Sequence, residues 1–229
     1  MTVILLRHGR STSNTAHTLA GRTEGVELDE KGTEQAAALP GRLEGLPIKA
    51  LVRSPLLRCR LTLEPLAAAL GLQPLVDERL AEVDYGQWTG RALGELIKEP
   101  LWSVVQQQPS AAVFPEGEGL AGVQARAVAA VREHDRRLRE EHGGDALWVA
   151  CTHGDVIKAV VADALGTHLD SFQRITADPA SMSVIRYTSL RPFVVHVNHT
   201  GAQLASALSA PPPADGDGGE DAVVGGSTD

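Results

Sequence analysis

The sequence predicts an α/β fold, a three-layer α/β/α sandwich with a mostly parallel central sheet. Apolar runs at residues 2–6, 50–52 and 146–150 have the length and composition of buried strands. Segments with helical spacing of apolar residues lie between them. Strands that alternate with helices form parallel sheets whose two faces are covered by helices. Such sheets bind ligands beyond the carboxyl ends of their strands, so the residues that follow each run are candidates for a site.

The first half of the chain supplies two of these strands and a helix between them. After the strand at 2–6, a helix is expected over about 30–43, where Pro40 should shorten or kink it. The run at 50–52 is short, apolar and rich in strand-forming residues, which favours a second buried strand.

A second helix is expected directly after the strand at 50–52. Ser54 is a suitable N-cap and Pro55 suits the first helical position. Pro65 lies inside this helix and should kink it. Gly71 is a plausible end, because glycine adopts the left-handed conformation that closes many helices.

The second half begins with an irregular segment, 77–119, rich in Gly, Gln and Pro. A long irregular excursion within a compact domain is usually functional. The clearest helix follows, with one apolar stripe formed by Leu120, Val123, Ala127, Val128, Val131 and Leu138. After the strand at 146–150, another helix should bury Val156, Ile157, Val160, Val161 and Leu165. Residues 183–187 and 193–197 are expected to close the sheet as strands.

Composition predicts one folded domain, residues 1–201, and an acidic Pro/Gly-rich tail, residues 202–229, that is disordered. The net charge is −8, of which the five acidic residues of the tail carry −5. An acidic chain without a basic cluster disfavours nucleic acid as a partner, and no apolar stretch is long enough to span a membrane. We expect a cytoplasmic protein with two reduced, buried cysteines, Cys59 and Cys151, and leave a homodimer open.

Polar residues that could take part in catalysis follow the first strand directly. They lie in the run RHGRS at 7–11, with Asn14 three residues further on. His8 can act as a nucleophile through one ring nitrogen if the other donates to a backbone carbonyl. Arg7 is suited to holding phosphoryl oxygens by charge-assisted hydrogen bonds. Gly9 lets the backbone come close without a Cβ. Asn14 can add a neutral donor, although it could equally be a turn residue.

This run resembles the RHG signature of the histidine phosphatase superfamily, also called the phosphoglycerate mutase-like family, and the resemblance extends over nearly the whole chain. It implies the phosphoglycerate mutase-like fold and phosphoryl transfer through a phosphohistidine on His8. It also implies that Gly9, Ser11 and Asn14 help to bind a small phosphorylated metabolite. No carboxylate-rich metal constellation is evident in the sequence, so we expect neither a metal nor another cofactor.

Three further blocks match the family in its order. The segment at 53–62 resembles the family's S-x-L-x-R motif, in which Arg58 would project onto the phosphate. The segment at 80–90 resembles the proton-donor loop, and the motif selects Glu82 as the acid. Because burial and cations shift a carboxyl in opposite directions, the sequence leaves the pKa of Glu82 open.

The last block, at 151–157, resembles the family's second H-G signature. There His153 would donate to the transferring phosphoryl group, and the amide of Gly154 would add a donor at the start of a helix. Four blocks in the family's order form a strong composite signal.

Mutases and phosphatases of this family share the core site, so the choice depends on its surroundings. A mutase needs a second basic cluster after the proton-donor loop, where Arg91 and Lys98 are the basic residues between Gly90 and Val123. The run PEGE at 115–118 also resembles a turn of the phosphatase branch. We therefore favour metal-independent phosphomonoester hydrolysis over a phosphoglycerate mutase-type phosphotransferase.

Two questions stay open at this stage. A phospho-ligand-binding module without turnover would keep the same pocket, although the intact blocks argue against it. An apolar group after the loop could form a partly apolar lid over the substrate, or it could be ordinary core packing; it comprises Trp88, Leu101, Trp102 and Phe114.

Overall fold

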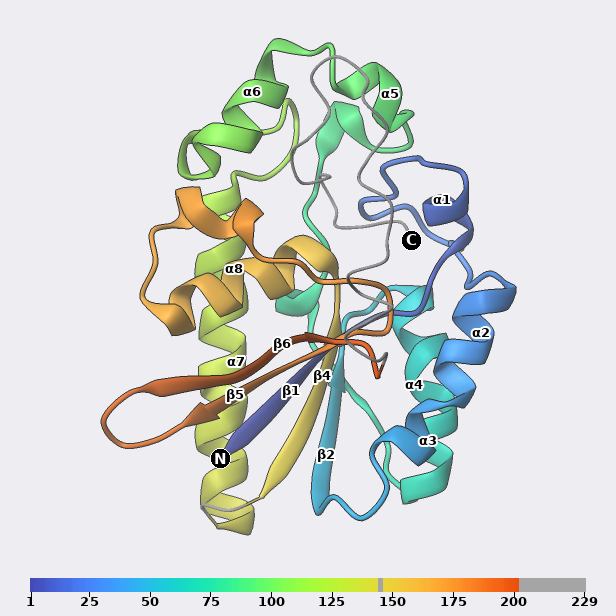
Figure 1. Cartoon of the computed structure of the whole chain (residues 1–229), viewed down its shortest axis with the longest axis vertical. Helices are drawn as coiled ribbons and strands as arrows, with labels where there is room; N and C mark the ends of the chain where they lie inside the picture. The colour runs from blue at the N-terminus through green and yellow to red at the C-terminus, as the bar shows by residue number, and fades with distance from the viewer. Residues whose placement is uncertain (144–145, 202–229) are drawn as a thin grey trace.

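The computed structural model describes residues 1–143 and 146–201, so the predicted tail lies outside the described residues. Its centre is one six-stranded sheet in the order β3-β2-β4-β1-β5-β6 (Figure 1). The strands are β1 Thr2–Arg7, β2 Ile48–Arg53, β3 Leu75–Val76, β4 Leu147–Thr152, β5 Met182–Tyr187 and β6 Pro192–His199. The first four run parallel to one another, and β5 and β6 are antiparallel additions next to β1.

Helices cover both faces of the sheet, as expected of a three-layer sandwich (Figure 1). The helices are α1 Thr12–Thr15, α2 Glu30–Ala37, α3 Leu39–Arg42, α4 Leu57–Leu70, α5 Leu93–Leu96, α6 Pro100–Gln107, α7 Leu120–His142 and α8 Gly154–Leu165. Short 3-10 turns occupy Glu78–Leu80, Gly86–Trp88, Pro109–Ala111 and Leu169–Arg174. The side chains of β1 alternate between the two layers: Val3 and Leu5 pack into one apolar cluster with α7 and α8, whereas Ile4 and Leu6 pack into the other with α3 and α4.

Most of the predicted elements are present. The first helix is divided at Ala38 into α2 and α3, next to Pro40 as expected. α4 ends at Gly71 in the left-handed conformation, although Pro65 inside it does not end the helix. The stripe of α7 is buried throughout, and Cys59 and Cys151 are free and buried.

Two local predictions are wrong. α4 begins at Leu57, and its N-cap residue is Leu56 with no side-chain cap, so Ser54 and Pro55 precede the helix. Leu165 is 50% exposed, because it is the last residue of α8 and the buried position of that turn is taken by Ala164.

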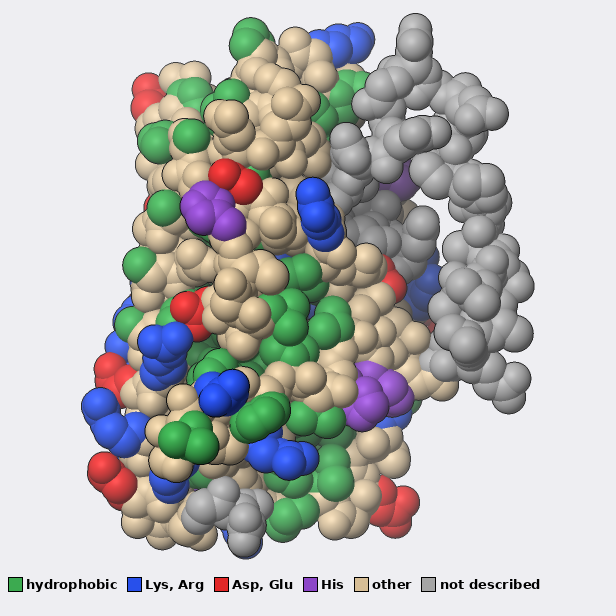
Figure 2. Space-filling model, turned by 60° about the vertical axis from the view of Figure 1, so that its left-hand side comes forward, with side chains coloured by type: hydrophobic (Ala, Val, Ile, Leu, Met, Phe, Trp, Pro, Cys, Tyr) green, Lys and Arg blue, Asp and Glu red, His purple; other side chains and the backbone are tan. Residues whose placement is uncertain are grey.

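The outer strand β6 presents apolar side chains to solvent. Phe193, Val195 and Val197 alternate along it and are each about half exposed. Figure 2 brings this side of the molecule forward and shows hydrophobic side chains next to Lys and Arg. The homodimer remains a prediction. None of the described helices is long and apolar enough to cross a membrane.

Candidate active site

His8 follows the last residue of β1 and is almost fully buried. Its Nδ1 lies 2.7 Å from the carbonyl oxygen of Gly9. Because a carbonyl only accepts, Nδ1 carries the proton and Nε2 keeps its lone pair, as predicted for a nucleophile. Burial, and after it the positive charges of Arg58 and Arg7, hold the pKa of His8 well below its usual value. The neutral ring is therefore favoured at physiological pH.

Two buried guanidinium groups lie around His8. On the first turn of α4, Arg58 places its Nε 3.2 Å from Nε2 of His8 and donates from Nη2 to the carbonyl of Gly21 at 2.8 Å. Its Nη1 is buried and makes no hydrogen bond within the described chain. Arg7 donates from Nη1 to the carbonyl of Ala177 at 2.7 Å. Both sequence-predicted arginines thus converge on one buried point, which suits a dianion.

His153 ends the β4–α8 connection and is also neutral, because burial and then Arg58 keep its pKa well below the usual value. Arg58 Nη2 lies 3.1 Å from its Nδ1, and the Ser54 hydroxyl lies 2.7 Å from its Nε2. Since a guanidinium only donates, Nδ1 is the acceptor in this arrangement. Gly154 begins α8, so its amide is among the free donors of the helix N-terminus. The rings of His153 and His8 lie 5.2 Å apart.

Gly9 is required by the protein's own backbone. A Cβ at this position would lie 2.7 Å from the carbonyl oxygen of Gly32 on α2. The amide of Gly9 donates to the hydroxyl of Thr62 at 2.9 Å, and that hydroxyl donates to the carbonyl of Arg58 at 2.6 Å. Thr62 therefore links the nucleophile's loop to the helix that carries Arg58, a role that the sequence did not reveal.

Ser11 and Asn14 have a structural role in the short helix α1. The hydroxyl of Ser11 is its N-cap, and the side-chain oxygen of Asn14 accepts from the amide of Ser11 at 3.0 Å and from its hydroxyl at 2.8 Å. This reciprocal arrangement is a capping box. It supports the alternative of a turn residue for Asn14, and phosphoryl binding by either side chain stays a prediction.

Glu82 lies on the loop between β3 and α5 and is almost fully buried. Its Oε1 accepts from the amide of Val83 at 2.9 Å. Burial, and next the charge of Asp155, raise the pKa of Glu82 to about 7, while Val83, Arg58 and Arg7 act in the opposite direction. The structure thus resolves the question that the sequence left open: desolvation prevails over the cations, and the carboxyl is available as an acid near neutral pH.

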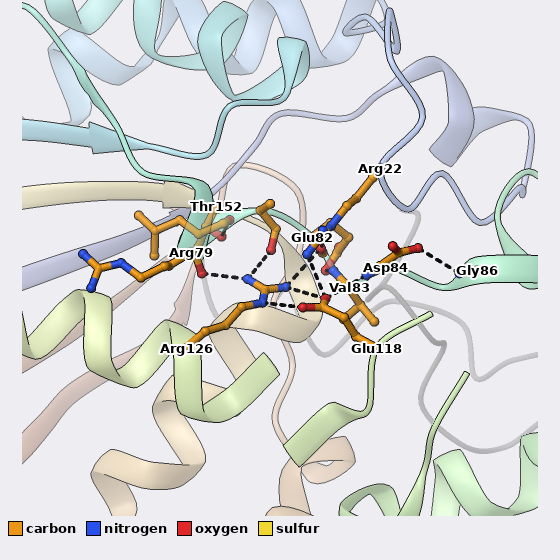
Figure 3. A network of polar contacts seen from close by, with 11 residues as sticks. Arg22, Arg79, Glu82, Val83, Asp84, Gly86, Glu118, Arg126 and Thr152 are labelled. Carbon is orange, nitrogen blue, oxygen red and sulfur yellow. Dashed lines mark hydrogen bonds and ion pairs between the residues drawn. The ribbon is translucent and has the colours of Figure 1, made fainter. Parts of the chain in front are cut away.

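Figure 3 shows how this loop is fixed. Arg126 of α7 donates to the backbone carbonyls of Arg79, Ala81 and Glu82 at 2.7, 2.8 and 3.1 Å. It also pairs with the Glu118 carboxylate at 2.9 Å. Glu118 accepts from the amide of Asp84 at 3.0 Å.

Arg22 adds a second clamp on the same loop, donating to the carbonyl of Glu82 and to Glu118, each at 2.9 Å. The PEGE turn therefore acts by clamping the Glu82 loop (Figure 3).

The aromatic group after the loop packs as core. Trp88 and Phe114 are buried, with ring centroids 5.3 Å apart, and Phe114 meets Tyr85 edge-on at 4.9 Å. Trp102 and Leu101 are half-buried against the same cluster. The packing alternative is correct for Trp88 and Phe114, which pack together, and Phe114 contacts Tyr85 of the Glu82 loop.

Within residues 1–143 and 146–201, no group of three or more His, Cys, Asp or Glu side chains is arranged to hold a metal ion. Arg58 and Arg7 supply positive charge beside His8.

Comparisons with known proteins agree with this geometry. Residues 3–200 match the model of the histidine phosphatase superfamily (branch 1). Phosphoserine phosphatase 1 of Hydrogenobacter thermophilus is 29% identical over 206 residues, covering 86% of this chain and 92% of its own. The probable phosphoglycerate mutase GpmB of Erwinia tasmaniensis is 29% identical over 184 residues, or 79% and 82%. A mycobacterial glucosyl-3-phosphoglycerate phosphatase solved with VO3 superposes with a TM-score of 0.78 at 25% identity, covering 86% and 99%.

Proposed function

This chain belongs to the histidine phosphatase superfamily, and we propose that it hydrolyses phosphate monoesters of small metabolites through a covalent phosphohistidine on His8. The observation that carries the proposal is the hydrogen bond from Nδ1 of His8 to the carbonyl of Gly9, which leaves the lone pair of Nε2 facing Arg58. Similarity to phosphatases named for phosphoserine and glucosyl-3-phosphoglycerate supports this substrate class.

In the first step Nε2 of His8 attacks phosphorus, the bond from phosphorus to the ester oxygen breaks, and Glu82 gives its proton to that departing oxygen. Arg7 and Arg58 hold the phosphoryl oxygens, and the Gly9 carbonyl steadies the charge that develops on the ring. In the second step the Glu82 carboxylate takes a proton from water, whose oxygen attacks phosphorus. The N–P bond then breaks, and inorganic phosphate leaves.

The ion pairs of Arg91 favour hydrolysis over phosphoglycerate mutase-type transfer. Its guanidinium pairs with Glu99 at 2.7 Å and with Glu95 at 3.9 Å, so its charge is already compensated. Lys98 is exposed on the surface. A transferase that retains a bisphosphorylated intermediate needs a second cationic group near the site, and this arrangement supports water as the acceptor.

The test is phosphate release from an aryl phosphomonoester and from a panel of phosphorylated metabolites, in excess chelator, beside His8→Ala. We expect turnover in wild type, its loss in the variant, and an acid-labile phosphoryl group on His8 after rapid quenching. Undiminished turnover in His8→Ala would exclude the mechanism. Unchanged ligand binding in the variant, with no turnover in wild type, would favour a binding module. Transfer from a bisphosphorylated primer to a phosphoglycerate would favour the mutase.

A further inference from the structure

A buried set of polar side chains lies behind Glu82 and has no part in the mechanism above. Its centre is Asp155 on the first turn of α8, which is fully buried. One carboxylate oxygen accepts from the hydroxyl of Tyr85 at 2.8 Å, and the other lies 3.5 Å from Nζ of Lys158. Lys158 in turn donates to Gln173 at 2.9 Å. A carboxylate is costly to bury, and these donors offset that cost.

Hydrogen bonds also join the Glu82 loop to the end of β4 and the start of α8, and Asp155 takes part in them. The hydroxyl of Thr152 donates to the carbonyl of Leu80 at 2.6 Å, and the hydroxyl of Tyr85 donates to Asp155. Glu82 lies between these attachments in the sequence. Asp155 therefore helps to fix the position of the loop and places a fixed negative charge close to it.

We propose that Asp155 is a positioning residue for the reaction, which anchors the Glu82 loop through the Tyr85 hydroxyl and sets a buried carboxylate beside the loop that carries the proton donor. The inference rests on the proposed role of Glu82 as the proton donor. A neighbouring carboxylate disfavours ionisation of a second carboxyl, so an acid that must hold its proton near neutral pH benefits from one.

The charges around Glu82 are of both signs. They come from Arg7 on β1, Arg58 on α4, Arg126 on α7, Arg22 on the loop before α2, and Asp155 and Lys158 on α8. Titratable groups that are neutral here also lie around these cations: Tyr85, His8 and His153. After burial, the charge of Asp155 makes the largest contribution that raises the pKa of Glu82, and Arg58 and Arg7 lower it. Without that negative charge the cations would be less strongly opposed, and the carboxyl would ionise at lower pH.

The test is the pH dependence of kcat/KM for an aryl phosphomonoester. Asp155→Asn keeps an acceptor for the Tyr85 hydroxyl and removes the charge. In the pH profile, kcat/KM falls at high pH as Glu82 ionises. We expect this falling limb to move to lower pH by roughly one unit in Asp155→Asn. Tyr85→Phe removes the anchor and no charge, so its limb should stay in place while kcat falls. A limb unmoved in Asp155→Asn would overturn the proposal, even if kcat falls.

Two further measurements keep the test decisive. Asp155→Asn/Lys158→Met leaves no unpaired charge at this position, and its limb should also move to lower pH. Carboxyl 13C NMR, assigned with Glu82→Gln, follows the ionisation of Glu82 without turnover. It therefore tests Asp155 even if the wild type hydrolyses nothing, an outcome that would count against the proposed function alone. An unchanged Glu82 titration in Asp155→Asn would again overturn the inference.

Discussion

The hydroxyl of Ser54 lies 2.7 Å from Nε2 of His153, and both side chains are completely buried. A serine hydroxyl can donate or accept, whereas the guanidinium of Arg58 on the opposite side of the ring only donates. In this arrangement Nε2–H donates to Ser54 and Nδ1 accepts from Arg58. For His153 to donate to a phosphoryl group, as predicted, Nδ1 must carry the proton, and we expect the Ser54 hydroxyl then to donate to Nε2. The Ser54 hydroxyl can therefore serve either tautomer of His153, and the Cys59 thiol lies 3.6 Å from the same nitrogen.

Ser54→Ala should lower kcat/KM for the aryl phosphomonoester roughly tenfold. The buried ring nitrogen loses its hydroxyl partner and keeps only the weak contact with the Cys59 thiol at 3.6 Å, and a poorly satisfied buried polar group costs about 1–3 kcal/mol. Steady-state kinetics beside thermal unfolding would measure this effect.

Ser183→Ala is the matched control, since Ser183 is equally buried in β5 and its hydroxyl accepts from the amide of Asn198 at 3.2 Å. The control should lose stability while its kcat/KM stays near the wild-type value. Equal kinetic losses in the two variants would show that Ser54 has no special connection to His153.

The position of α2 against the nucleophile's loop leads to a second prediction. A Cβ at Gly32 would lie 1.9 Å from the carbonyl oxygen of Arg10, which is backbone and cannot turn aside. Gly32→Ala should therefore destabilise the protein by about 3 kcal/mol or more, since overpacking moves the backbone. Gly122→Ala is the comparison, because that helical glycine has open space around its Cβ position. It should be neutral or stabilise by up to about 1 kcal/mol. Denaturant unfolding of both variants checks the difference.

The sequence predicted the framework well because each strand and helix is encoded locally, by an apolar run such as 146–150 or by the stripe of α7. Prediction failed where a side chain contacts a residue far away in the sequence and not the neighbouring backbone that its local pattern suggests. Ser54 before Pro55 has the pattern of a helix start, but its hydroxyl is bound to His153, 99 residues away. The contact from Tyr85 to Asp155 spans 70 residues and follows no motif in the sequence.

The pKa of Glu82 belongs to the same class of facts. Whether this pKa is raised or lowered depends on how the effect of desolvation compares with that of Arg7 and Arg58. Only the folded arrangement sets that balance. Resemblance to the family's motifs, by contrast, sufficed to select Arg7, Arg58 and His153, which lie around His8.

The proton donor predicts a pH dependence for the reaction. Phosphorylation of His8 needs neutral His8, whose pKa is well below its usual value, and protonated Glu82, whose pKa is about 7. We therefore expect kcat/KM to stay high on the acidic side of neutrality and to fall as the pH rises through about 7. Glu82→Gln should be slower throughout and should lose this falling limb. A limb that persists in Glu82→Gln would assign it to another group.

The same carboxyl should make the stability of the wild type fall relative to that of Glu82→Gln as the pH rises. The folded state raises the pKa of Glu82 to about 7 from 4.5, so the unfolded state releases this proton more readily. Its contribution to folding is complete below pH 4.5 and is lost as the pH rises through about 7. Glu82→Gln removes the buried titration. The free energy of unfolding of Glu82→Gln minus that of wild type should therefore increase by up to about 3 kcal/mol between acidic and alkaline pH. Unfolding measured across this range for both proteins gives the difference, and His8→Ala serves as a comparison that leaves Glu82 in place. A constant difference between wild type and Glu82→Gln would mean that folding leaves the pKa of Glu82 unchanged, and its assignment as the acid near neutral pH would fail with it.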